Sequence, residues 1–339
     1  MTNMTEFQFL SSDGHTQLHG MLWEPTDTPV RAVLQVCHGV AEHIARYDAF
    51  ARALNEQGIV VAGHDHLGHG KSLPQGGTPV YFGQGNTWNT VVDDIYVLHQ
   101  RLLQKYPDTP LCIMGHSMGS FLTRTYLIRY PGTVKAAVIM GTGWQPHAVI
   151  TGGLAVADAV IALKGENATS DVVTELAFGA YNKLFAPNRT KVDWLSADES
   201  NVDDYIADPL CGADATVGLF RQMLHGLRFN QRQSNLRRMD ADTPVLFVAF
   251  YFLFYVVNGS TDYLTSTLMN EAAPPSQRAT LLSASSLSMQ LGGLAASPLL
   301  SAGAAVGTIP QVWLAAGGAL TALMLVWLAV HLLRARKTK

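Results

Sequence analysis

A serine in a glycine-rich segment is the residue best suited to chemistry in this sequence. Residues 115–120 read GHSMGS and directly follow an apolar run. A sharp turn from a strand into a helix requires small residues on either side of the serine, and Gly115 and Gly119 meet that requirement. The pattern predicts that Ser117 is an exposed nucleophile rather than an ordinary helix-capping serine.

A serine nucleophile also needs hydrogen-bond donors for the oxyanion that forms when it attacks a carbonyl group. The backbone N–H of Met118, the residue after the serine, stands at the start of a predicted helix. A second N–H is expected from Val40, because His38 and Gly39 form the HG pattern that lets backbone approach a substrate. We therefore expect an oxyanion hole made by Val40 and Met118.

Strands and helices that could position these residues alternate along the first 140 residues. Their periodicity predicts strands at 4–10, 17–23, 31–37, 59–64, 111–115 and 135–140, and helices at 46–57, 87–105 and 118–130. Such alternation favours a mostly parallel, doubly wound α/β sheet with helices on both faces and ligands at the carboxyl ends of the strands. The following residues, 144–238, are helical and loop-like, as in a cap, and 244–249 resumes the strand pattern.

Charge and cysteine content exclude other classes of protein. Residues 1–243 carry 18 Lys and Arg against 24 Asp and Glu, an acidic balance that disfavours nucleic acid as a partner. The three cysteines, Cys37, Cys112 and Cys211, show neither a CxxC pair nor the spacing of metal ligands. We interpret them as reduced residues that pack in the fold.

Three histidines crowd one loop, at His64, His66 and His69. A metal site would need further ligands in a defined geometry, so we interpret this loop as structural and expect no metal and no cofactor.

Four motifs, in order along the chain, resemble the monoacylglycerol lipase and lysophospholipase branch of the α/β-hydrolase family. They are HGVAEHIARYDAFARAL, GHDHLGHGKS, GHSMGS and DWLSADESNVDDYIADPLCG, and the similarity covers residues 1 to about 249. The resemblance implies an eight-stranded sheet with its core at 1–143, a helical cap and return to the core at 144–238, and a last remaining core strand at 239–249. It also implies that a fatty-acyl ester lipid is hydrolysed through an acyl-enzyme.

The same resemblance implies a substrate pocket that includes Gly39, Glu42, Arg46 and His116. Glu42 and Arg46 are expected near the end of the pocket that receives the polar head group. Their alternative role is a structural ion pair that braces the loop, and the sequence leaves both roles open.

The sequence departs from the family pattern after the strand at 244–249. The family places its catalytic acid in a Gly-Asp-x-Asp type turn after this strand, and its histidine one strand later. Here Ala249 is followed by FYFLFYVV, Leu253 stands where the aspartate is expected, and the only later histidine is His331. We therefore expect the acid and the base of the triad to be absent and catalysis to be impaired.

Residues 250–339 resemble the last three transmembrane helices of a major facilitator superfamily transporter. The similarity rests on NEAAPPSQRATLLSASSLSMQLGGLAASPLL and on the uncharged run 312–330, which ends in a basic segment. The resemblance implies a multi-pass membrane tail, and the absence of a visible secretory signal places the hydrolase part in the cytosol. The alternatives are a membrane-anchored protein that binds acyl ligands without turnover, or a non-functional fusion with a transporter fragment.

Overall fold

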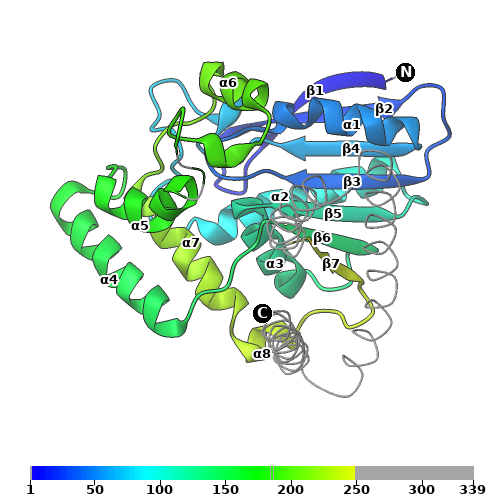
Figure 1. Ribbon diagram of the computed structural model, residues 1–339. Coiled ribbons are helices and arrows are strands. Elements are labelled where there is room, and N and C mark those ends of the chain that lie inside the picture. Colours follow the sequence, from blue (N-terminus) through cyan, green and yellow to red (C-terminus); the bar gives the residue numbers. More distant parts are fainter. Residues whose placement is uncertain (1, 184, 186, 249–339) are drawn as a thin grey trace, which may run out of the picture. The chain divides into compact units, whose positions relative to one another are not determined.

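Seven strands form one sheet in the part of the chain that the computed structural model describes, residues 2–183, 185 and 187–248 (Figure 1). Their order is β1-β2-β4-β3-β5-β6-β7. Their bounds are β1 (Thr2–Leu10), β2 (Gln17–Pro25), β3 (Ala32–Cys37), β4 (Ile59–His64), β5 (Leu111–His116), β6 (Ala136–Met140) and β7 (Val245–Phe247). The strands from β4 to β7 pair in parallel, whereas β2 pairs antiparallel with β1 and β4. The predicted, mostly parallel sheet is confirmed.

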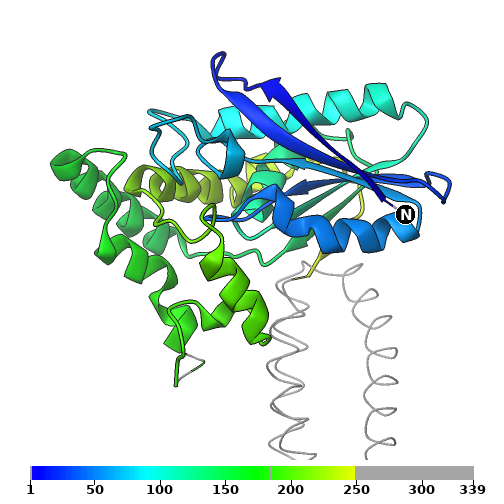
Figure 2. The same ribbon diagram turned by 90° about the horizontal axis from the view of Figure 1, so that it is seen from above.

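Helices cover both faces of this sheet, and α1 and α2 lie on opposite faces (Figure 2). On one face a 3₁₀ turn (Ile44–Tyr47) and α1 (Asp48–Glu56) pack in a cluster with Trp23 and Val61. On the other face α2 (Trp88–Lys105) and α3 (Met118–Arg129) pack in the main core. The helices predicted at 46–57, 87–105 and 118–130 are therefore confirmed, with ends that differ by one or two residues.

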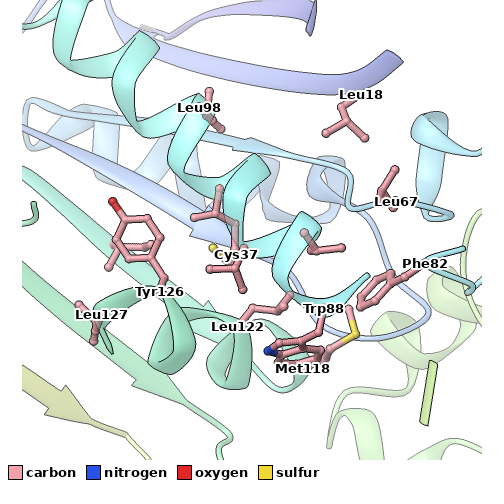
Figure 3. Packing of buried hydrophobic residues seen from close by; sticks show 14 of the residues in the cluster. Leu18, Cys37, Leu67, Phe82, Trp88, Leu98, Met118, Leu122, Tyr126 and Leu127 are labelled. Carbon is pink, nitrogen blue, oxygen red and sulfur yellow. The ribbon is translucent and has the colours of Figure 1, made fainter. Parts of the chain in front are cut away.

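The main core fixes the start of α3, where the candidate nucleophile lies. Figure 3 shows Trp88 and Leu98 of α2 near Leu122 and Tyr126 of α3, together with Cys37 from the end of β3. Each fully buried side chain of this size contributes roughly 1.5–3 kcal/mol of hydrophobic stabilisation. Cys37 is a free, buried thiol, as expected of a packing residue.

The helices between β6 and β7 lie to one side of the sheet (Figures 1 and 2). They are α4 (His147–Lys164), α5 (Asp171–Lys183), a 3₁₀ turn (Asp193–Leu195), α6 (Glu199–Ala207), α7 (Val217–Asn230) and α8 (Gln233–Leu236). The chain returns to the core through α7, which packs against α3 and α4. Gly226 of α7 lies so close to the Trp88 ring that a Cβ atom there would overlap it.

One helix of the described residues, α4, is long and apolar enough to cross a membrane. Its 18 residues have a mean hydropathy of 1.5, and 17% of them are buried. Length and composition alone meet this criterion. The membrane spans expected after residue 249, and the transporter-like tail with them, lie outside the described residues.

Candidate active site

The turn at Ser117 has the conformation of a nucleophile elbow. Ser117 stands between β5 and α3 with φ 51° and ψ −118°, a backbone region that residues with a Cβ rarely adopt. Its N–H donates to the Met140 carbonyl at 3.0 Å, and the Ser120 hydroxyl donates to the Ser117 carbonyl at 2.5 Å. Contacts with β6 and with the first turn of α3 therefore hold the serine in place at the carboxyl end of β5.

Two glycines provide the clearance that the elbow needs, as the sequence predicts. A Cβ on Gly115 would overlap the Gly119 carbonyl and the Thr123 hydroxyl. A Cβ on Gly119 would overlap the backbone of Cys37 and of His38. Because β3 approaches α3 backbone to backbone at Gly119, no side chain can give way there.

We expect Gly119→Ala to destabilise the fold by about 3 kcal/mol or more, because the added methyl group must displace the backbone of β3. Urea unfolding followed by circular dichroism measures this loss. Gly152→Ala is the matched control, because Gly152 lies within α4 and a Cβ there has no neighbour within 4 Å. That control should be neutral or slightly stabilising. Equal stabilities of the two variants would contradict the close approach.

The loop after β3 lies directly against the elbow. Val40 occupies the turn that follows β3, and Met118 is the first residue of α3. A Cβ on Gly39 would lie 3.2 Å from Ser117 Cβ and 3.4 Å from His116 Nδ1. The structure therefore brings together the two segments that carry Val40 and Met118, the residues predicted to form the oxyanion hole.

Glu42 is a buried carboxylate with several donors around it. Its Oε1 accepts from Gly39 N at 2.6 Å and from Tyr47 Oη at 3.2 Å, and it lies 3.0 Å from His116 Nδ1. Its Oε2 accepts from Arg46 Nη1 at 2.7 Å. Burial disfavours the charge of Glu42, but the hydrogen bond and charge of His116 and the charge of Arg46 outweigh it and lower the pKa to about 2. The structural ion pair weighed for Glu42 and Arg46 is thus present.

Buried histidine rings also pack against the loop after β3. His38 is 4.2 Å from His66 between ring centroids, and His66 is 5.1 Å from His64. His38 Nε2 accepts from the backbone N–H of His66 at 3.0 Å, while His38 Nδ1 lies 2.8 Å from the Gly39 carbonyl oxygen. These contacts join the loop after β4 to the loop after β3, which is the structural role interpreted for the histidine loop.

Ser117 lacks a proton acceptor among the residues described. In residues 2–183, 185 and 187–248, no histidine or carboxylate hydrogen-bonds to Ser117 Oγ. The segment where the family pattern would place the acid and the base begins at residue 249, outside the described residues. The expected absence of both groups therefore stays a prediction from the sequence.

The cap segment 205–212 contacts the loop after β3, a contact that no sequence pattern predicts. Tyr205 Oη and Gly212 N donate to the Ala41 carbonyl at 2.9 and 3.0 Å, and the guanidinium of Arg46 lies over the Tyr205 ring at 4.9 Å. A further link joins His43 Nε2 to Asp208 Oδ2 at 2.7 Å. The only signal in the sequence was that DWLSADESNVDDYIADPLCG stands among the four motifs of the resemblance, and that motif does not reveal its partner.

Comparison with known proteins agrees with this geometry. The model of a family described as serine aminopeptidase, S33, matches residues 28–268. Human monoglyceride lipase is 30% identical over 250 residues, which cover 71% of this chain and 68% of the human protein. A monoacylglycerol lipase of Mycolicibacterium smegmatis is 35% identical over 126 residues, 37% of this chain and 42% of that protein.

Solved structures show the same fold. A thermostable carboxyl esterase from Bacillus coagulans, solved in complex with glycerol, superposes with a TM-score of 0.64 at 25% identity over 71% of this chain and 78% of the esterase. A monoglyceride lipase variant from Saccharomyces cerevisiae superposes with a TM-score of 0.53 at 15% identity, covering 68% of this chain and 72% of that one. The chain therefore belongs to the serine aminopeptidase S33 family of α/β-hydrolases, as a serine hydrolase similar to the monoglyceride lipases, which are carboxylic ester hydrolases.

Proposed function

We propose that the chain acts on fatty-acyl ester lipids of the monoglyceride type, with Ser117 as the nucleophile. The observation that carries this proposal is the strained Ser117 elbow lying against the loop after β3. The Ser117 oxygen would attack the ester carbonyl, and the backbone N–H groups of Val40 and Met118 would stabilise the oxyanion. Expulsion of the alcohol leaves an acyl-enzyme, and water then releases the fatty acid and restores the serine.

The polar end of the substrate would lie at Glu42, Arg46 and His116. Arg46 and His116 have side chains that are 32% and 37% exposed, so both can reach a head group while each remains bound to the carboxylate of Glu42. The low pKa of Glu42 keeps that carboxylate charged, which fixes the two donors in position. Gly39, between Glu42 and Ser117, leaves room for the ester to approach the backbone.

The apolar end of the substrate would lie under the cap. Apolar side chains are abundant on α4 and α5, where several remain exposed, namely Val149, Val156, Leu163, Val172 and Leu176. Such a surface supports an amphiphilic lipid as substrate rather than a polar ester or a peptide.

We also propose that turnover is severely impaired, because no acid or histidine follows β7 in the family pattern. The residues directly after Ala249, FYFLFYVV, carry no acid, Asp262 and Glu271 are the only later acidic residues, and His331 is the only later histidine. Binding without turnover is the resulting alternative function, with residues 250–339 proposed as a membrane anchor that leaves the hydrolase part in the cytosol. A transporter-like origin of that segment and a non-functional fusion remain proposals from the sequence alone.

A fluorophosphonate probe tests the nucleophile and its activation together. We expect labelling only at Ser117, at a rate about 10³-fold or more below that of human monoglyceride lipase, because nothing removes the proton of the hydroxyl. Ser117→Ala should abolish labelling, and Ser234→Ala, at an exposed serine of α8, should leave it unchanged. Labelling that survives in Ser117→Ala would overturn the nucleophile assignment, and rapid labelling of the unaltered chain would overturn the impairment.

A further inference from the structure

Three residues of types that commonly bind metals lie together where the cap contacts the loop after β3. They are His43 from that loop, and Asp208 and Cys211 from the segment between α6 and α7. One ring nitrogen of His43, one carboxylate oxygen of Asp208 and Cys211 Sγ all lie within 4.8 Å of one another, and His43 Nε2 lies 2.7 Å from Asp208 Oδ2. His43 and Asp208 are 165 positions apart in the sequence, so folding alone creates this group.

The local backbone prepares each of the three side chains. The Leu210 N–H donates to Asp208 Oδ1 at 2.9 Å, which leaves Oδ2 directed at His43. The Cys211 N–H donates to the Asp208 carbonyl at 3.0 Å, and this turn places the thiol beside the carboxylate. His43 packs closely on Gly70, where an added Cβ would lie 2.8 Å from His43 Cβ. One nitrogen, one oxygen and one sulfur atom are thus held by backbone contacts.

We propose that His43, Asp208 and Cys211 form a binding site for one Zn²⁺-type cation that joins the cap to the loop after β3. Imidazole, carboxylate and thiolate together are ligands of zinc, whereas calcium and magnesium require oxygen ligands alone. Tetrahedral zinc places such ligand atoms about 3.3–3.6 Å apart, so shifts of roughly 1 Å close the site. This proposal differs from the prediction made from the sequence, which assigns Cys211 a packing role and expects no metal.

Binding is a simple exchange of a proton for the metal. The thiol of Cys211 releases its proton to solvent as the sulfur–metal bond forms, the hydrogen that His43 Nε2 donates to Asp208 Oδ2 in the metal-free chain moves to Nδ1 so that the Nε2 lone pair can bind the metal, and no oxidation state changes. A bound divalent cation deprotonates a coordinating thiol.

The position of the group leaves a path for the metal. The His43 side chain is 9% exposed, that of Asp208 is 29% exposed, and Cys211 is half-buried. Three protein ligands with one partly open side leave the fourth coordination position to water. Occupancy would tie the segment 208–212 to the loop that carries Val40 and Glu42, in addition to the hydrogen bonds that Ala41 already accepts.

Cobalt titration of the full-length, chelator-treated chain tests the site without relying on activity. We expect one Co²⁺ per chain, with a thiolate-to-cobalt charge-transfer band, and displacement of Co²⁺ by Zn²⁺. Cys211→Ser should remove the band and weaken binding by about tenfold or more, since even the loss of an outer partner of a metal ligand costs that much. Cys112→Ser, at a half-buried cysteine outside the group, should retain both.

A second variant and a second measurement distinguish the loss of a metal ligand from misfolding of the Cys211→Ser variant. Asp208→Asn keeps the shape of the side chain but removes a charged ligand, and it should weaken Zn²⁺ binding while its circular dichroism matches the unaltered chain. Zn²⁺ should raise the melting temperature of the unaltered chain and not that of Cys211→Ser, because a ligand of the native state stabilises it. If the charge-transfer band is absent from the unaltered chain, or persists in Cys211→Ser, the proposed metal site is overturned. His43 and Asp208 then join the cap to the loop after β3 through their hydrogen bond alone.

Discussion

Ser117→Ala should change the rate of ester hydrolysis by this chain less than about tenfold, because triad residues act as a unit. If the acid and the base are missing, as proposed, then removal of the nucleophile lowers the rate of hydrolysis only a little further. The rate that remains should be about 10³- to 10⁴-fold above that of water, from binding and from the oxyanion donors alone. Release of fatty acid from a monoglyceride by the purified full-length chain and by Ser117→Ala measures the ratio of the two rates.

A chimera provides the positive control for this comparison. In it, the residues after Val248 are replaced by the corresponding C-terminal part of human monoglyceride lipase, the part in which the family pattern places the acid and the histidine. In the chimera, Ser117→Ala should cost about 10⁴-fold or more. If Ser117→Ala lowers the rate of hydrolysis by the unaltered chain as much as it does in the chimera, a proton acceptor reaches Ser117. That result would contradict the proposed impairment.

The free energy of unfolding should fall steeply as the pH falls below about 6, because four buried histidines must remain neutral in the folded state. Burial lowers the pKa of His64 and of His69 to about 3, lowers the pKa of His38, and lowers that of His66 well below its usual value. In the unfolded chain all four pKa values return to about 6.5. The unfolded state therefore binds more protons between pH 6.5 and about 3, and stability falls as the pH falls through that window.

The expected size of this effect is large compared with the stability of an ordinary domain. Each histidine contributes up to about 1.4 kcal/mol per pH unit, so the four together contribute up to about 5.5 kcal/mol per unit, against a total free energy of unfolding of about 5–15 kcal/mol. Both ring nitrogens of His64 lack a partner among the described residues, so His64→Leu removes one titrating group without breaking a hydrogen bond.

Urea unfolding between pH 4.5 and 7.5 measures the slope of stability against pH. His64→Leu should reduce the slope by about 1.4 kcal/mol per pH unit, and His147→Gln, at an exposed histidine, should leave it unchanged. A slope that is the same for all three proteins would contradict a neutral, buried His64.

Local chemistry explains which features the sequence could predict. The alternation of apolar strands with amphipathic helices located six of the seven described strands within two residues, and Val245–Phe247 matched the run predicted at 244–249. Gly115 and Gly119 around Ser117 predicted the elbow because only glycine fits where backbone meets backbone. Both signals are short in range, and a single sequence displays them directly.

Contacts between residues far apart in the sequence could not be predicted from these short-range signals. Nothing near His43 in the sequence indicates that it meets Asp208 and Cys211, since Asp208 lies 165 positions further along the chain. The charged carboxylate of Glu42 likewise depends on donors from Gly39, Arg46 and Tyr47 together with the ring of His116 after β5. The sequence could name Glu42 and Arg46 as a pair but could not choose between their two roles.

Among the described residues, the hydrogen bonds and close approaches at the Ser117 elbow come from residues 37–141, that is, from the end of β3 and its loop, from α3 and from the end of β6. During synthesis on the ribosome this segment emerges before any residue of the C-terminal third. A change confined to the residues after β7 would leave these contacts in place, so the shape of the elbow and the reactivity of its serine can vary independently.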